Sequence, residues 1–335
     1  MLDFGPKSAR VLIAEKKADG NFDILGAGDT AAQGMKDGEF AHLGDAVECV
    51  VEAVRKAERS SGLAIQRLYY NFDDPGMEGV WSRGGKSLSG EGEIRRQDVE
   101  DARKTAERLV GHFEKNIVYS KVISSVIDGR DAVEDPVGVF GRNLEVSAYI
   151  LLARSKHCEA WWKLFERAHL ERGVPVISAW SAALGVLNKE NRQKKSAVFD
   201  IDFDFLNALV FINDKISDSR TILTQELSAQ KVGERVMEWL KEFTAQDAEL
   251  ESVWVTGELS ENEKILSQVR NSVGLPVERG VPLGVSRIHE PRFSSIAGLI
   301  HAADEMEKRI PILDRDKGIF VNVKERTLSF LNEYF

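Results

Sequence analysis

The sequence is poor in cysteine and contains no long hydrophobic run. Only two of its 335 residues are cysteines, Cys49 and Cys158, and they lie far apart without the spacing of a metal site. This excludes a disulfide framework and is typical of a protein in a reducing cytosol. No apolar stretch approaches the roughly 20 residues that span a bilayer, and no signal-peptide pattern opens the chain. We therefore expect a cytoplasmic protein.

The sequence also has fewer basic than acidic residues. The chain has 45 Lys and Arg against 54 Asp and Glu, which gives a net charge of −9 at pH 7. Because nucleic-acid binding needs a positive surface over the phosphates, we expect no nucleic-acid partner. What is present is the composition of a folded protein, with 43% hydrophobic and 30% charged residues. The length is enough for one to three domains.

The start of the chain reads as the opening of an α/β domain. Apolar runs at Val11–Glu15 and Asn21–Ala27 flank the turn Ala18-Asp19-Gly20, which indicates a hairpin. Apolar residues recur at helical spacing over Asp45–Ser60, and Ile65–Phe72 reads as another strand. Two strands, a helix and a further strand are typical of an α/β fold.

The composition changes at the turn cluster Asp73-Asp74-Pro75-Gly76. From there to about Ala153, the pattern mixes strands with one helix. The helix is predicted over Arg96–Val110, and two of the strands over Ile117–Ile127 and Leu144–Leu152. We interpret this stretch as a small α+β module inserted into the larger fold.

The α/β alternation resumes after Ser155, with a polar linker expected at Asn191–Lys195. Helices are predicted over Lys156–His169, Ser181–Asn188, Ser228–Thr244, Glu261–Val273 and Pro291–Glu305, and strands over Val174–Ser178, Ala197–Ile201, Ala208–Ile212, Arg220–Gln225, Ser252–Thr256 and Val277–Arg279. Two α/β halves, each opening beside an Asp-bearing turn, fit a duplicated actin/sugar-kinase-type fold. Periodicity alone fits a Rossmann-like arrangement nearly as well.

Several segments occur in an order that narrows this choice. They are the Asp-x-Gly turn in Leu2–Ser8, the stretch Asp135–Glu145 (DPVGVFGRNLE), Val255-Thr256-Gly257 and Ser294–Leu299, with further matches at 24–28, 33–38, 168–170 and 177–183. They resemble the first phosphate loop, the signature closing the inserted subdomain 1C, the adenosine-loop strand and the closing helix of the FtsA-like bacterial actins. The resemblance runs from Leu2 to about Ala303.

The resemblance implies an actin-like α/β fold with an inserted 1C-type subdomain. It divides the chain into subdomain 1A (1–78 and 154–190), the 1C-like insertion (79–153), subdomain 2A (191–290), a closing helix and linker (291–313) and a C-terminal amphipathic tail (314–335). Subdomain 2B is expected to be missing, because Thr221–Glu226 runs almost directly into the helix at Ser228–Thr244. The family uses 2B to wall the nucleotide cleft, to build filament contacts and to receive the FtsZ tail, so filament formation and FtsZ binding stay open.

The resemblance also places nucleotide-binding loops on this chain. The corresponding residues are Asp3, Gly5, Lys7, Ser8, Asp200, Asp202, Asp204, Thr256 and Gly257. The second phosphate loop departs from the family, since it contains Phe203 and Phe205 and no glycine, and glycine is what lets backbone N–H groups close on phosphate. We therefore expect vestigial loops, no catalytic residues, no metal and no cofactor, with weak binding of Mg-ATP as the alternative.

The C-terminal tail is amphipathic when read as a helix. At about 100° per residue, one arc gathers the apolar side chains Ile319, Phe320, Val323, Leu328, Leu331, Tyr334 and Phe335. FtsA ends in a similar membrane-binding helix, so the resemblance implies an anchor here. The tail is poor in Lys and Arg, and the alternative is a terminal element that packs on the protein's own body, with Ile319–Val323 as an edge strand.

Together these features predict a scaffold rather than an enzyme. The resemblance implies a membrane-peripheral adaptor of cell division or envelope assembly at the inner face of the cell membrane. Its expected partners are other proteins, including copies of itself through 1C-type contacts, and the membrane surface through the tail. The alternatives are a residual Mg-ATP-binding ATPase of the actin superfamily and a PilM-like scaffold of pilus assembly.

Overall fold

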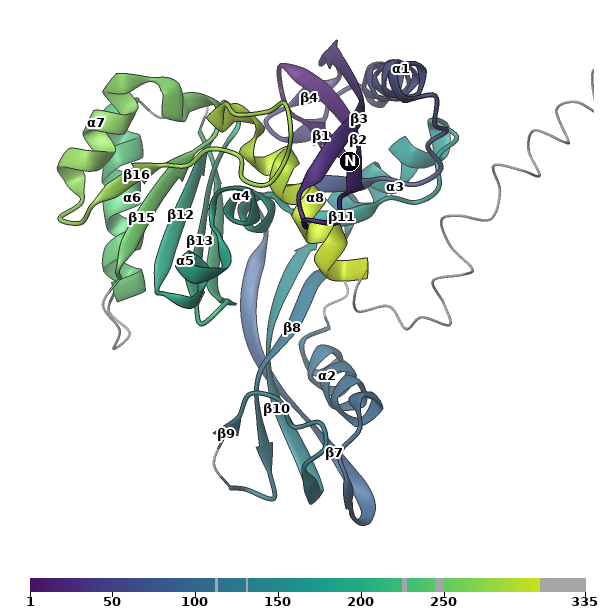
Figure 1. Ribbon diagram of the computed structural model, residues 1–335, viewed down its shortest axis with the longest axis vertical. Coiled ribbons are helices and arrows are strands. Elements are labelled where there is room, and N and C mark those ends of the chain that lie inside the picture. The colour runs from purple at the N-terminus through teal and green to yellow at the C-terminus, as the bar shows by residue number, and fades with distance from the viewer. Residues whose placement is uncertain (112–113, 131, 225–227, 245–249, 308–335) are drawn as a thin grey trace, which may run out of the picture.

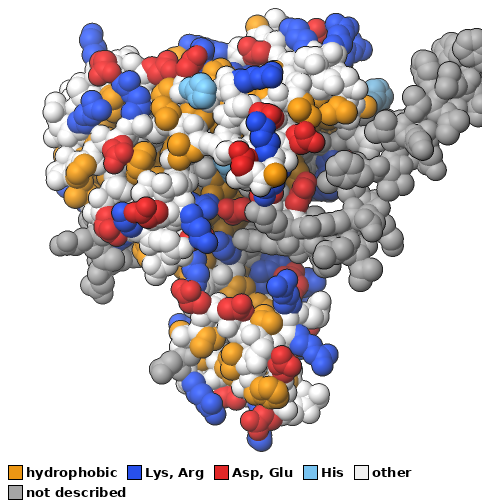
Figure 2. Space-filling model, viewed as in Figure 1, with side chains coloured by type: hydrophobic (Ala, Val, Ile, Leu, Met, Phe, Trp, Pro, Cys, Tyr) orange, Lys and Arg blue, Asp and Glu red, His pale blue; other side chains and the backbone are white. Residues whose placement is uncertain are grey.

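A computed structural model describes residues 1–335 except 112–113, 131, 225–227, 245–249 and 308–335. The described residues form a broad body with a sheet in each half and a narrow lobe that projects from it (Figure 1). On the face shown in Figure 2, basic and acidic side chains are interspersed over both parts rather than gathered in one patch of a single sign. None of the described helices is both long and apolar enough to cross a membrane.

The first half of the body is built on a five-stranded sheet in the order β11-β6-β1-β2-β3. Its strands are β1 (Leu2–Phe4), β2 (Ser8–Lys16), β3 (Phe22–Ala31), β6 (Tyr69–Phe72) and β11 (Val174–Ile177). The first three strands form an antiparallel meander, which confirms the predicted hairpin, and β6 and β11 continue the sheet in parallel. The strand predicted from Ile65 begins only at Tyr69.

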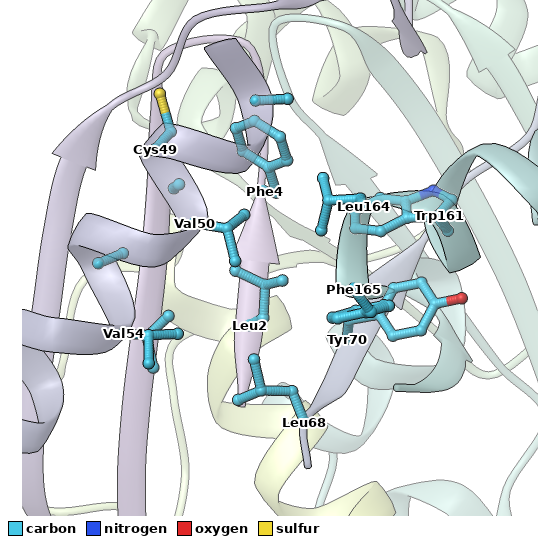
Figure 3. Packing of buried hydrophobic residues seen from close by; sticks show 14 of the residues in the cluster. Leu2, Phe4, Cys49, Val50, Val54, Leu68, Tyr70, Trp161, Leu164 and Phe165 are labelled. Carbon is cyan, nitrogen blue, oxygen red and sulfur yellow. The ribbon is translucent and has the colours of Figure 1, made fainter. Parts of the chain in front are cut away.

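The apolar core of the first half lies between this sheet and two helices. These are α1 (Leu43–Ser61) and α3 (Ser155–Arg167). Figure 3 shows Val50 and Val54 of α1 on one side of Leu2, with Trp161 and Phe165 of α3 on the other. Because the apolar residues recur at helical spacing, each helix buries one face and leaves its charged face in water. Between β3 and α1 lies a small hairpin of β4 (Met35–Lys36) and β5 (Glu39–Phe40).

The second half repeats the same sheet order, β14-β13-β12-β15-β16. Its elements are β12 (Ser196–Ile201), β13 (Phe205–Ile212), β14 (Lys215–Leu223), α6 (Ala229–Thr244), β15 (Ser252–Thr256), η1 (Glu258–Glu261), α7 (Glu263–Ser272) and β16 (Val277–Arg279). Again three antiparallel strands are followed by two parallel ones. Only residues 224–228 separate β14 from α6, which is too few for an inserted subdomain.

Two helices join the halves at the centre of the body. α4 (Ser178–Val186) follows the first sheet, and α8 (Ser294–Glu307) follows the second after η2 (Pro291–Phe293). Each carries a glycine at their contact: a Cβ atom at Gly185 would overlap the carbonyl oxygen of Ser294, and one at Gly298 would overlap that of Ser181. The helices therefore touch backbone to backbone, which leaves no room for a side chain.

The narrow lobe is a four-stranded sheet in the order β7-β10-β8-β9, with one helix across a face. Its elements are β7 (Glu78–Glu93), α2 (Arg96–Val110), β8 (Lys115–Ile127), β9 (Ala132–Val133) and β10 (Phe140–Arg154). The predicted helix and the two predicted strands are confirmed, whereas β7 was not identified. The sequence of β7 is rich in Gly, Ser and charged residues and carries little β-propensity, and its pairing with β10 is what makes it a strand.

One predicted connection is wrong. Asn191–Lys195, expected to be a polar linker, overlaps a short helix, α5 (Lys189–Gln193). The side chain of Asn188 accepts a hydrogen bond from the backbone N–H of Asn191, and this N-terminal cap makes a single helical turn favourable.

Candidate functional site

A small cavity of about 60 Å³ lies between the two halves, where their central strands end. It is lined by Asp3, Phe4, Gly5, Pro6, Lys7, Ser8, Arg10, Met35, Asn71, Asp73, Ser178, Asp200, Asp202, Asp204, Phe205, Glu258, Arg292 and Ser295. The strands β1 and β12 occupy equivalent places in the two sheets, so the turns that follow them face each other. Seven of the nine predicted nucleotide-loop residues therefore come together: Asp3, Gly5, Lys7, Ser8, Asp200, Asp202 and Asp204.

The other two predicted residues lie beside the cavity rather than in its lining. Thr256 is fully buried, and its hydroxyl donates to the Ser294 hydroxyl at 2.7 Å, which ties β15 to α8. Gly257 has a φ of +89°, and a Cβ atom there would crowd the carboxylates of Asp200 and Asp202. Glycine is therefore required at this turn both for its backbone conformation and for space.

The first half contributes a network of hydrogen bonds around Asp3. The Asn71 side chain donates to Asp3 at 3.1 Å and accepts from the Ser181 hydroxyl at 2.6 Å. The Arg10 guanidinium lies 3.6 Å from Asp3 and donates to Glu258 of the second half at 2.8 Å. Arg10 thus joins a carboxylate of each half across the cavity.

The second half contributes a tight turn between β12 and β13. The backbone N–H of Asp202 donates to the carbonyl of Phe205 at 2.9 Å. The Asp202 carboxylate accepts from the backbone N–H of Glu258 at 2.7 Å, so this N–H is already satisfied within the chain. The Phe205 side chain lines the cavity, whereas the Phe203 ring lies under Lys7, whose amine is 3.1 Å from the ring centre.

The charges in the cavity are mainly acidic and poorly solvated. Burial raises the pKa of Asp73 to about 7, although the Ser178 hydroxyl donates to it at 2.7 Å. Burial and the nearby Asp202 carboxylate raise the pKa of Asp200 well above its usual value. Asp200 is 2% exposed, and neither of its oxygens has a hydrogen-bond partner among the described residues. A cavity with this charge takes up protons readily and disfavours a polyanion.

The same carboxylates do not make a metal centre in the described part of the chain, where no group of three or more His, Cys, Asp and Glu side chains has a suitable arrangement. The residues that the sequence reasoning missed here are Arg10, Asn71, Asp73, Ser178, Glu258, Arg292 and Ser295. Asp73 had been assigned only to a turn. Its position directly after a buried strand was the available signal, because such positions meet at one edge of a sheet.

A second hollow, of about 320 Å³, lies between the narrow lobe and the second half. Trp81 and Ile123 line it from the lobe, and Ile212 and Ile216 from the β13–β14 hairpin. At its rim Lys215 donates to the carbonyl of Ile123 at 2.7 Å and pairs with Glu134. The predicted membrane-binding residues, Ile319 to Phe335, lie outside the described residues.

Comparison with known proteins gives the narrow lobe a family. Residues 76–152 match the family described as "SHS2 domain inserted in FTSA". The cell division protein FtsA of Neisseria meningitidis is 21% identical over 93% of this chain and 91% of its own length. The FtsA proteins of Bacillus subtilis and Borreliella burgdorferi are 23% and 22% identical. In these two, the chain spans 62% and 52% of the relative's length.

A solved structure supports the fold across both halves. The PilM-PilN type IV pilus biogenesis complex contains a chain that superposes with a TM-score of 0.64 over 90% of this chain and 97% of its own, at 12% identity. Identity this low speaks for the fold alone. The predicted actin-like α/β architecture and the predicted resemblance to FtsA-like proteins are confirmed: the chain has the actin-like fold, its residues 76–152 belong to the SHS2 family inserted in FtsA, and most of its length is similar in sequence to FtsA proteins.

Proposed function

We propose that this protein is a scaffold of bacterial cell division that attaches to the inner face of the membrane and does not use nucleotide. The division role rests on the similarity to cell division proteins named FtsA. The predicted subdomain boundaries and the roles of the individual site residues belong to the same proposal. FtsZ binding and filament formation are not part of it.

The observation that carries the proposal is the size and chemistry of the cavity between the halves. Sites for small molecules usually enclose several hundred cubic ångströms, whereas this cavity holds about 60 Å³. Phe205 occupies one wall, and Pro6 has no N–H to offer a phosphate. The Asp200 carboxylate has no hydrogen-bond partner among the residues that the structure describes. These features favour a pseudo-ATPase over an enzyme.

The membrane-binding part of the proposal rests on the sequence of the tail. An amphipathic helix binds the interface through its buried apolar area, and the arc from Ile319 to Phe335 supplies bulky side chains for this. The described helices offer no membrane span as an alternative attachment.

The test is co-sedimentation of the full chain with liposomes, with and without Mg-ATP. A version ending at Asp314 removes the tail, and a Leu331→Asp/Phe335→Asp variant places charge on its apolar arc. The matched control, Asn332→Asp, places a charge on the polar side of the same segment. We expect the full chain and the control to pellet, the other two to stay in solution, and Mg-ATP to change nothing.

Two outcomes would refute the proposal in different ways. If the full chain and the truncated chain partition equally, the tail is no anchor, and packing on the protein's own body becomes the better account. If Mg-ATP raises the melting temperature, as a ligand that binds only the folded state does, the protein is a residual Mg-ATP-binding ATPase.

The structural similarity to the PilM-PilN complex favours a second candidate, a scaffold of pilus assembly. In this candidate the protein is still a scaffold, but it belongs to a pilus-assembly complex instead of a cell-division complex. Crosslinking in cells followed by identification of the attached proteins separates the two, since division proteins support the first candidate and pilus proteins the second.

A further inference from the structure

The turn between β12 and β13 reaches across the cavity and contacts the first half with two aromatic side chains. The Phe203 ring lies under the amine of Lys7, 3.1 Å from the ring centre. The Phe205 ring rests on Gly38, in the turn of the β4–β5 hairpin, so closely that a Cβ atom at Gly38 would overlap it. Phe205 is 8% exposed, so this contact is almost dry.

The turn that carries these rings is held firmly by its own half. The hydroxyl of Thr224 lies 2.9 Å from the carbonyl oxygen of Asp202 and 2.7 Å from that of Phe203, and it shares its one hydrogen between them. The backbone N–H of Thr224 donates to the carbonyl of Asp204 at 2.8 Å. The two rings are thus presented in fixed positions, so little conformational entropy is lost when they meet the first half.

A third contact also crosses the cavity. Arg10 of β2 donates to Glu258 at 2.8 Å and to the carbonyl of Arg292 at 3.4 Å. The halves are also joined by α4 and α8, which pack backbone to backbone, and by hydrogen bonds between Phe22 of β3 and the backbone of Gly284 and Ser286. The turns at the cavity are a further, separate set of contacts between the halves. An opening of the halves at the cavity would break all three bridging contacts.

We propose that Phe203 and Phe205 form a clasp that holds the two halves closed without any ligand. A ligand shifts a two-state equilibrium only by its differential affinity for the two states. Here the chain itself supplies the contacts that favour the closed state. The inference rests on the proposed function, because the clasp occupies the place where a nucleotide would otherwise bridge the halves.

The test measures the separation of the halves in the full chain by double electron–electron resonance. Spin labels at Arg55→Cys on α1 and Arg270→Cys on α7 report on the two halves, since both side chains are exposed and outside the contacts above. Cys49 and Cys158 are buried, and each is replaced by Ala to prevent stray labelling. The wild-type clasp should give one narrow distance distribution in the absence of nucleotide.

Removing the rings should open the molecule. We expect Phe203→Ala/Phe205→Ala to give a longer and broader distribution. Lys7→Met removes the charge over the ring from an exposed side chain and should give part of that effect without endangering the fold. Phe140→Ala, at an exposed phenylalanine of the narrow lobe, is the matched control and should leave the distribution unchanged.

The clasp and the proposed function can fail separately. The clasp is disproved if the double alanine variant and Lys7→Met both keep the narrow wild-type distribution. A shift of the wild-type distribution on adding Mg-ATP contradicts the nucleotide-free function instead, while the variants measured without nucleotide still decide on the clasp.

Discussion

The two halves of the body share one sheet order and differ in the turns that end their central strands. In the first half, β1 leads into a turn with Gly5, whereas β12 of the second half leads into a turn with Phe203 and flanking acids. In both halves the strands bury apolar side chains in a core against their helices. The turns after β1 and β12 can therefore differ without a change of fold, and it is the residues of these turns that determine the chemistry of the site.

The contact between α4 and α8 is also built from equivalent residues of the two halves. Ser181 and Gly185 on α4 match Ser294 and Gly298 on α8 in both residue type and spacing. Each glycine faces the serine carbonyl of the other helix, so the pair is reciprocal. This symmetry is expected of two equivalent helices that cross at one point.

The largest predicted effect comes from breaking this contact. Gly298→Ala should lower the free energy of unfolding by about 3 kcal/mol or more, because the new methyl group meets backbone that cannot move aside. Gly185→Ala should act alike. The measurement is urea unfolding of each variant. Gly274→Ala, where a Cβ atom meets nothing, is the control and should change stability by less than about 0.5 kcal/mol.

A second difference between the halves is the insertion that only the first one carries. The narrow lobe leaves the first half after β6 and returns at α3, whereas η1 and two further residues, Gly257 and Asn262, suffice between β15 and α7. Asp74 at the exit is fully buried, and it accepts from the side chain of Arg154 at 2.7 Å and from its backbone N–H at 2.8 Å. This ion pair joins the segment that enters the lobe, before β7, to the end of β10, where the chain leaves it.

Arg154→Met should therefore cost about 2–4 kcal/mol, because it leaves the buried Asp74 carboxylate without its charged partner. Thermal unfolding of the full chain measures the loss. Arg83→Met removes an exposed arginine that lies 3.7 Å from Glu145, and it should cost under about 0.5 kcal/mol. Equal losses for the two variants would contradict the special role of the buried pair.

Much of the fold could be predicted from the sequence, because its elements carry regular patterns. Helix α2 was predicted with the bounds that the structure has, since its helical periodicity is clear. Strand β7 could not be, because its sequence resembles a loop and only its partner β10 makes it extended. Local patterns thus identify elements that bury one face, and they miss elements that depend on a distant neighbour.

The site could be predicted only where turn residues follow strands. Asp3 and Asp200 were identified because they lie in or beside such turns and resemble phosphate loops. Arg10 could not be, since nothing in β2 indicates that this charged residue faces Glu258 from the other half. Contacts between halves depend on their relative placement, which no local pattern encodes.

The third prediction concerns the residues that follow equivalent strands, Asp73 after β6 and Gly257 after β15. Burial raises the pKa of Asp73 to about 7, while an unfolded Asp titrates at about 3.9. Between these values the folded state holds a proton that the unfolded state has lost, so the stability from this group falls as the pH rises to 7. Asp73→Asn cannot ionise and retains a side-chain oxygen to accept from Ser178.

Measured against the wild type, Asp73→Asn should gain stability as the pH rises from about 4.5 to 8, by on the order of 1–2 kcal/mol. Urea unfolding at several pH values checks this. Asp19→Asn is the control, because hydrogen bonds from Asn21 lower the pKa of that exposed carboxylate. Its difference from the wild type should not grow with pH, and a flat difference for Asp73→Asn as well would contradict the raised pKa.

The smallest predicted effects compare α1 and α6, which follow the third strand of each meander. Before α6, the hydroxyl of Ser228 accepts a hydrogen bond from the backbone N–H of Lys231 at 3.3 Å and so caps the helix. Before α1, the backbone of His42 is extended as a cap requires, but its side chain makes no capping hydrogen bond with the described residues. His42→Ser should raise the free energy of unfolding by about 0.5–1 kcal/mol, and Ser228→Ala should lower it by a similar amount. Urea unfolding of the two variants and of the double variant measures both effects. Because the caps lie in different halves without shared partners, the changes should cancel in the double variant. A double variant that departs from this sum would mean that the two caps are coupled through the contacts between the halves.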